Sequence, residues 1–181
     1  LNAEIISFMD EAMDYVDANG VGLVIGNQAS GMPGAFSAGA DLVQVGTAAK
    51  TGRLEEVDEM IKALHAVIQK ETFSPFPVVA APFGLALGGG CEVCLAADRI
   101  VAHAELYMGL VEIGVGLLPG GGGCKNLWKK AVSSIPSHVK DVDLSKFFIP
   151  TFMSIATAKV SMSAAQAKSN GFLGPQDRIV F

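Results

Sequence analysis

The most informative stretch of this chain reads Gly84-Leu-Ala-Leu-Gly-Gly-Gly-Cys-Glu-Val-Cys-Leu-Ala-Ala-Asp98. It opens on an apolar run and reaches three consecutive glycines, which tolerate a tight turn because they lack side chains. The composition from residue 91 to residue 97 suits a helix and includes no helix breaker. This order predicts a strand, a tight glycine turn and then a helix.

The sequence on either side alternates between patterns typical of strands and patterns typical of helices. Short apolar runs predict buried strands at 21–25, 78–81 and 100–102. Helical spacing of apolar residues, capping signals and composition predict helices at 1–18, 54–68, 124–132, 144–158 and 163–169. A loop is expected at 26–34 and a short apolar end at 179–181. The alternation favours an α/β fold with much parallel pairing.

Composition indicates a single globular domain. The chain has 181 residues, of which 50% are hydrophobic and 17% are charged, and its mean hydropathy is +0.42. These values exclude a disordered tail. A membrane helix is also disfavoured, because the long uncharged run at 72–91 contains three prolines and four glycines. We therefore expect no membrane insertion.

Charge and cysteine content limit the partners further. The net charge is −5 and the pI is near 5.1, without a block of Lys or Arg, so nucleic acid is not an expected partner. The three cysteines show no disulfide-scaffold spacing and no signal segment is evident, which favours a reducing, cytoplasmic compartment. Cys91 and Cys94 form a Cys-x-x-Cys pair, but no close histidine pair accompanies them. We expect these two cysteines to pack a helix, and we expect no metal site.

A nucleotide cofactor site is not expected either. The glycines at 120–123 are not followed by Lys-Ser or Lys-Thr, and the chain has no Gly-x-Gly-x-x-Gly. His65, His103 and His138 lack a nucleophile in a suitable context, so none of them is given a role.

Two glutamates stand out as acid/base candidates. Glu92 follows the triple glycine, and Glu112 lies in an otherwise apolar and glycine-rich segment. A carboxyl group in such surroundings has a raised pKa, which suits proton transfer near neutral pH. The N–H groups exposed by Gly88, Gly89 and Gly90 could stabilise an oxyanion. Considered singly, either glutamate could instead cap a helix or lie at a surface edge.

Three blocks taken together resemble the signature of the crotonase (enoyl-CoA hydratase/isomerase) superfamily. They are residues 36–42 (Phe-Ser-Ala-Gly-Ala-Asp-Leu), residues 84–98, and residues 112–123 (Glu-Ile-Gly-Val-Gly-Leu-Leu-Pro-Gly-Gly-Gly-Gly). The resemblance implies one crotonase-like domain over 1–181, a ββα superhelix truncated at its N-terminus, with a core at 1–135 and a helical part at 136–181. The four-glycine block is most similar to crotonase modules fused to a 3-hydroxyacyl-CoA dehydrogenase.

The resemblance also implies roles for individual residues. Glu92 and Glu112 match the two catalytic carboxyls. Ala40 and Gly89 match the backbone N–H groups of the oxyanion hole. The substrate-binding positions that match are Phe36, Ala38, Asp41, Leu42 and Gly88. In the family a basic residue often follows the Ala-Asp-hydrophobic run, which is 40–42 here, whereas this chain has Val43 at that place.

The implied activity is hydration of the 2,3 double bond of a 2-enoyl-CoA in fatty-acid β-oxidation. Coenzyme A would be part of the substrate, and no separate cofactor is expected. The expected partners are the acyl-CoA thioester and either further copies of this chain or other parts of a larger fused chain. An enoyl-CoA Δ3-Δ2 isomerase, which would need only Glu112, is one alternative. A non-catalytic acyl-CoA-binding or assembly module is another.

Overall fold

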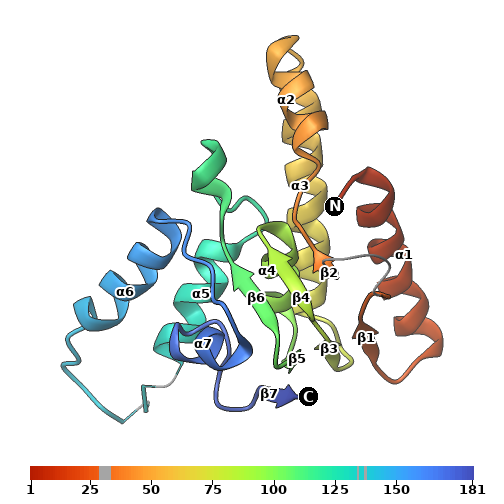
Figure 1. Cartoon of the computed structure of the whole chain (residues 1–181). Helices are drawn as coiled ribbons and strands as arrows, with labels where there is room; N and C mark the ends of the chain where they lie inside the picture. The colour runs from red at the N-terminus through yellow and green to blue at the C-terminus, as the bar shows by residue number, and fades with distance from the viewer. Residues whose placement is uncertain (29–33, 134, 137) are drawn as a thin grey trace.

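Two parallel β-sheets form the centre of the molecule. The computed structural model describes residues 1–28, 34–133, 135–136 and 138–181. Within these residues the strand order is β1-β3-β5-β7 in one sheet and β2-β4-β6 in the other, and all neighbours are parallel. Helices surround the sheets, and α2 and α3 project together beyond them (Figure 1).

The chain builds these sheets by repeating one unit: a strand in the first sheet, a strand in the second, then helix. The first unit is β1 (Leu23–Ile25), β2 (Ala35–Ser37), α2 (Leu42–Lys50) and α3 (Leu54–Thr72). The second is β3 (Val78–Ala80), β4 (Gly84–Leu87) and α4 (Gly89–Ala96). The third is β5 (Arg99–His103), β6 (Leu106–Gly109), the 3₁₀ helix η1 (Glu112–Val115) and α5 (Gly123–Val132). This repetition is the ββα superhelix that the resemblance implied.

The remaining elements lie at the two ends of the chain. They are α1 (Ala3–Asn19), α6 (Ser145–Ala156), α7 (Ala164–Ser169) and β7 (Arg178–Val180). The predicted helices agree with the observed ones to within one or two residues at most ends, except that α3 runs four residues beyond the predicted 54–68. Five elements were not predicted as such: β2, α2, β6, η1 and β7. Of the predicted loop at 26–34, residues 29–33 lie outside the described residues.

Helices α1 and α3 pack against each other beside the sheets. Asn2 caps α1, since its side chain accepts a hydrogen bond from the Ile5 N–H at 3.0 Å. Ile6 of α1 and Ile68 of α3 are buried in one apolar cluster between them. Other apolar side chains of α1 stay outside this cluster, and Phe8 is 69% exposed.

Helix α4 is the most enclosed element, and all eight of its residues are buried. Its close approach to β2 depends on glycine, because a Cβ on Gly90 would lie 2.6 Å from the Cβ of Ser37. Cys91 and Cys94 carry free thiols and belong to the main apolar core around this helix. Their predicted role in helix packing is confirmed.

Asp177 fastens the C-terminal segment to the first sheet. One of its carboxylate oxygens accepts a hydrogen bond from the Ile100 N–H at 2.8 Å, and the other forms an ion pair with Lys130 at 2.7 Å. No helix in the described part of the chain is long and apolar enough to cross a membrane. The same residues contain no cluster of His, Cys, Asp and Glu that could hold a metal ion.

Candidate active site

Glu92 lies in the first turn of α4 and is only 2% exposed. Its Oε1 accepts a hydrogen bond from the Gly123 N–H at 2.8 Å. Burial raises the pKa of the Glu92 carboxyl above its ordinary value, and the N–H groups of residues 121–123 oppose that rise. The four-glycine segment therefore holds the side chain of Glu92 through its backbone.

Glu112 begins the 3₁₀ helix η1. Both of its carboxyl oxygens are shielded from solvent and have no hydrogen-bond partner among the described residues. Burial is the main cause that raises the pKa of this carboxyl to about 7, and the nearby charge of Glu92 adds to the rise. At neutral pH Glu112 can therefore either donate or accept a proton.

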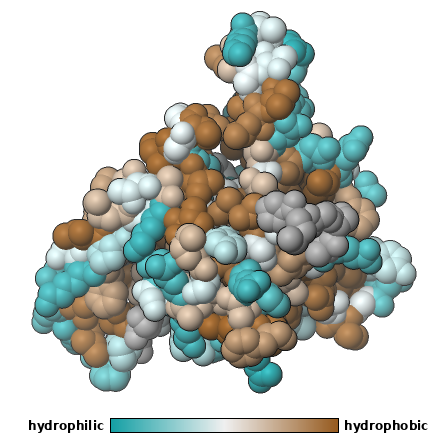
Figure 2. Space-filling model, in the orientation of Figure 1, coloured by the Kyte–Doolittle hydropathy of each residue, from teal (hydrophilic) through white to brown (hydrophobic). Residues whose placement is uncertain are grey.

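The two glutamates line one cavity of about 450 Å³. A volume of this size suits a small-molecule site. Much of the remaining lining is apolar and comes from α2, α3 and residues 115–118. Figure 2 shows apolar surface on both sides of the hollow below the projecting end of α2 and α3. The site thus combines two protonatable groups with walls suited to an apolar substrate chain.

Two backbone turns meet beside the carboxyls. Gly39 and Gly88 both have positive φ, at 95° and 54°, a conformation that glycine adopts without steric cost. A Cβ on Gly89 would lie 3.9 Å from the Ala40 nitrogen, so the segments around residues 40 and 89 are neighbours. Both residues line the cavity. The two residues whose N–H groups the resemblance assigns to an oxyanion hole thus line one cavity.

The structure separates the predicted substrate-binding residues into two groups. Ala38, Leu42 and Gly88 line the cavity with the glutamates. Phe36 is instead buried in the core. The carboxylate of Asp41 caps α2 by accepting hydrogen bonds from the N–H groups of residues 43 and 44. Substrate contact by Phe36 and Asp41 stays a prediction that this arrangement does not support directly.

The sequence analysis missed the residues that hold Glu92 in place. A Cβ on Gly121 would lie 2.7 Å from Glu92 Oε2, and one on Gly123 would lie 3.0 Å from Glu92 Oε1. The glycine run was interpreted as a rejected phosphate loop and as part of the third signature block, and in neither case was it connected to Glu92. The apolar face of α3, with Met60, Ile61 and Leu64 on the cavity wall, was visible as helical periodicity but was not connected to the site.

A ββα superhelix with two shielded carboxyls beside paired backbone turns defines a crotonase-type protein. Residues 1–139 match the profile of the family described as Enoyl-CoA hydratase/isomerase. The chain belongs to that family.

Named relatives extend this assignment. A Bacillus subtilis protein named "Probable 3-hydroxyacyl-CoA dehydrogenase" is 41% identical over 179 residues, which are 99% of this chain and 21% of that protein. A protein of Rickettsia felis, described as a fatty acid oxidation complex trifunctional enzyme, is 32% identical over 142 residues, 78% of this chain and 19% of its own length. The chain thus spans about one fifth of these relatives.

The fold agrees with solved structures. An enoyl-CoA hydratase from Bacillus anthracis superposes with a TM-score of 0.75 at 25% identity. The match covers 99% of this chain and 60% of that one. The chain is therefore similar to the crotonase part of fatty-acid oxidation proteins, and it spans a part of a typical member of the superfamily.

Proposed function

We propose that this chain hydrates 2-enoyl-CoA thioesters in fatty-acid oxidation, as one module of a longer protein that also contains a 3-hydroxyacyl-CoA dehydrogenase. The observation that carries the proposal is the convergence of Glu92 and Glu112 on one cavity, both with a raised pKa. The fusion is suggested by the names of the multifunctional relatives.

In the proposed reaction one water molecule lies between the two carboxyls. Glu92, held by the Gly123 N–H, accepts a proton from this water as its oxygen attacks Cβ. Glu112 in its neutral form donates a proton to Cα. Proton exchange between the two carboxyls then restores the starting state, so the net change is addition of one water.

The thioester carbonyl gains negative charge during this attack. We assign its stabilisation to the N–H groups of Ala40 and Gly89, which lie on adjoining turns. The α3 residues of the cavity wall would hold the acyl chain. The coenzyme A portion of the substrate would lie toward the open side of the cavity. It would be part of the substrate and not a separate cofactor.

Retention of both carboxyls favours hydration over isomerisation. A double-bond shift needs one group that removes and returns a proton, and Glu112 alone could perform it. Glu92 lines the same cavity and has a raised pKa, so a second acid/base group is available beside Glu112 for the water that hydration requires.

The proposal is tested with purified protein and crotonyl-CoA. Hydration removes the absorbance of the conjugated thioester, and we expect that loss to be catalysed. The control is the double variant Glu92→Gln, Glu112→Gln, which should bind the thioester but leave the absorbance unchanged. Folded native protein that binds coenzyme A thioesters without consuming crotonyl-CoA would overturn the proposal in favour of a binding module. Turnover of a 3-enoyl-CoA without hydration would favour an isomerase.

A further inference from the structure

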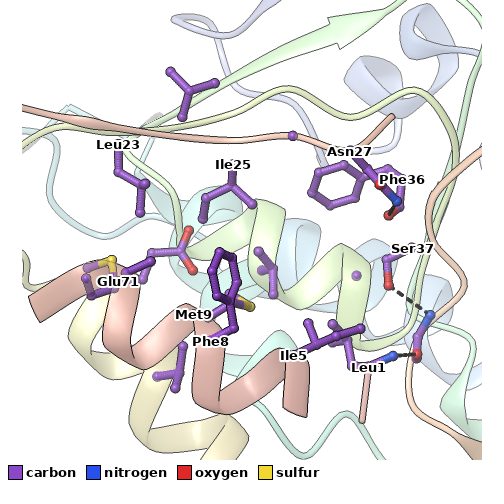
Figure 3. Close-up of a pocket in the computed structure, with 18 of the residues that line it drawn as sticks. Leu1, Ile5, Phe8, Met9, Leu23, Ile25, Asn27, Phe36, Ser37 and Glu71 are labelled. Carbon is purple, nitrogen blue, oxygen red and sulfur yellow. Dashed lines mark hydrogen bonds between the residues drawn. The ribbon is translucent and has the colours of Figure 1, made fainter. Parts of the chain in front are cut away.

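The two glycine turns beside the carboxyls are held by different parts of the chain. The Gly39 N–H donates to the Oγ of Ser37 at 3.2 Å, and Figure 3 shows this bond at one end of a neighbouring cavity. The Gly88 N–H donates to the carbonyl of Gly109 at 3.0 Å. Gly109 is the last residue of β6. The second turn is therefore supported by the end of β6.

Gly109 also determines where Glu112 lies. Only two residues separate them in the chain, and a Cβ on Gly88 would lie 3.4 Å from Glu112 Oε1. Gly109 is joined to Gly88 by a hydrogen bond and to Glu112 by this short connection, so a shift of Gly109 would move both. The end of β6 is thus a common support for one carboxyl and for one turn assigned to the oxyanion hole.

A segment from the C-terminal part of the chain packs against Gly109. The segment 158–161 lies between α6 and α7, and Ser161 pairs with Met108 in an antiparallel bridge with two backbone hydrogen bonds, at 2.8 and 3.2 Å. A Cβ on Gly109 would lie 2.5 Å from the carbonyl oxygen of Lys159. Glycine permits this approach because it has no side chain. The 158–161 segment is therefore in close contact with the residue that supports the site.

The 158–161 segment begins with a strained backbone. Ala158 has a φ of 49°, a left-handed conformation that is unfavourable for a residue with a Cβ. Hydrogen bonds at the end of α6 hold it there, including one from the Lys159 N–H to the Ser154 carbonyl at 2.9 Å. Ala158 also lies beside η1, since a Cβ on Gly114 would lie 3.8 Å from its own Cβ. Strain of this kind persists only where the surrounding structure enforces it, and it clusters at functional sites.

One side chain ties the segment to α7. The amide nitrogen of Asn170 donates to Ser161 Oγ at 2.9 Å, and its carbonyl oxygen accepts from Lys159 Nζ at 2.9 Å. Ser161 is fully buried, and a buried hydroxyl requires such a partner. Helix α7 itself packs against β6. Asn170 therefore links two residues of the segment to the helix that covers β6.

We propose that the 158–161 segment is a positioning element of the active site, and that Asn170 is the positioning residue that holds it in place. The proposal rests on the hydration proposed above. Through its contact with Gly109, the segment keeps the Gly88 turn and the start of the Glu112 turn in one relative position. Among the described residues that line the cavity, none belongs to the segment. Its effect on the reaction is therefore indirect.

The kinetic test uses steady-state hydration of crotonyl-CoA. Asn170→Ala removes both side-chain hydrogen bonds, and we expect kcat to fall about tenfold while KM changes by less than about twofold, because the reacting groups shift but the cavity walls do not. Asn170→Asp should restore most of kcat, since its carboxylate accepts from Lys159 and from the hydroxyl of Ser161. Ser169→Ala is the matched control, because its hydroxyl donates to the Ala165 carbonyl within α7. It should keep the native kcat.

Hydrogen exchange tests the positioning without substrate. In Asn170→Ala the Gly88 amide should exchange about tenfold faster, because its acceptor on Gly109 is held less firmly. The amides of β3, in the other sheet, should keep their native rates. Ser161→Ala keeps the backbone bridge and loses only the hydroxyl. It should change the exchange of the Gly88 amide in the same direction, and it serves if the first variant does not fold.

Three outcomes would each overturn the proposal. They are an unchanged exchange rate of the Gly88 amide in Asn170→Ala, an equal loss of kcat in Ser169→Ala, and no recovery of kcat in Asn170→Asp. Absence of hydration by the native protein would instead overturn the proposed function. The exchange of the Gly88 amide would then decide the positioning by itself.

Discussion

The substitution Gly121→Ala, which adds one methyl group, should displace the carboxyl of Glu92 without unfolding the protein. A Cβ at that place would lie 2.7 Å from Glu92 Oε2 and 2.8 Å from the Cδ1 of Ile68, whereas ordinary contact begins near 3.4 Å. The carboxyl must therefore move by roughly 0.7 Å. Since a misplacement of about 1 Å can cost about 10²-fold in rate, we expect Gly121→Ala to lower kcat by about 10- to 100-fold.

Both obstructing atoms end flexible side chains, so the protein should remain folded. The assay is steady-state hydration of crotonyl-CoA, with a thermal melt and thioester affinity measured in parallel. Gly120→Ala is the matched control, because the shortest contact of its Cβ would be 3.2 Å, to the Cγ2 of Ile61, and no atom of Glu92 is among its three nearest neighbours within 4 Å. It should keep kcat within a few-fold. Equal and near-native rates for both variants would show that the position of Glu92 is not critical.

Three further predictions concern the carboxyl groups. Glu92→Gln and Glu112→Gln should each lower the hydration rate by about 10²–10⁴-fold. The rate loss in the double variant should be far smaller than the product of the two single losses, because both groups act on one water. Near-native hydration by either single variant would contradict the paired mechanism. The value of kcat/KM should fall above about pH 7, where Glu112, with its pKa near 7, loses the proton that it donates, and a pH–rate profile of Glu112→Gln should lack this limb. Glu71→Leu should raise the free energy of unfolding by about 1–3 kcal/mol, because it removes an unpartnered buried carboxyl, and the thermal midpoint should rise by about 2–4 °C per kcal/mol. The exposed Glu55→Leu is its control, and an equal shift in both variants would refute the assignment to burial.

The features of the fold that sequence could predict are those with strong local signals. The triple glycine and the apolar run before it predicted β4 and α4, and the long amphipathic patterns predicted α1 and α3. Helix α2 was missed because its sequence, Leu-Val-Gln-Val-Gly-Thr-Ala-Ala-Lys, includes two valines and a glycine with low helix propensity. Its cap by Asp41 and its contact with α3 stabilise it instead. The three residues of β2 form a strand only because β4 pairs with them.

The candidate site, like the fold, could be predicted from the sequence only in part. The two glutamates were identified from their unusual neighbours in the sequence, and Ala40 and Gly89 from the resemblance. The hydrogen bond from Gly123 to Glu92 spans 31 residues and exists only after α4 packs against α5. No local pattern could have shown that the glycine run exists to approach a carboxyl group.

The placement of the two acids predicts different hydrogen-exchange behaviour. Glu92 belongs to α4, in which every residue is buried, so the backbone amides of α4 should exchange only when the whole domain opens. Glu112 begins a 3₁₀ turn in which Ile113 and Val115 are exposed, and its amides should exchange through local fluctuations of far lower free energy. One acid is thus fixed to the rigid frame of the protein and the other to a segment that can open. Substrate and product should therefore enter and leave by displacing the turn that carries Glu112, while the water-holding side of the site keeps its shape throughout turnover.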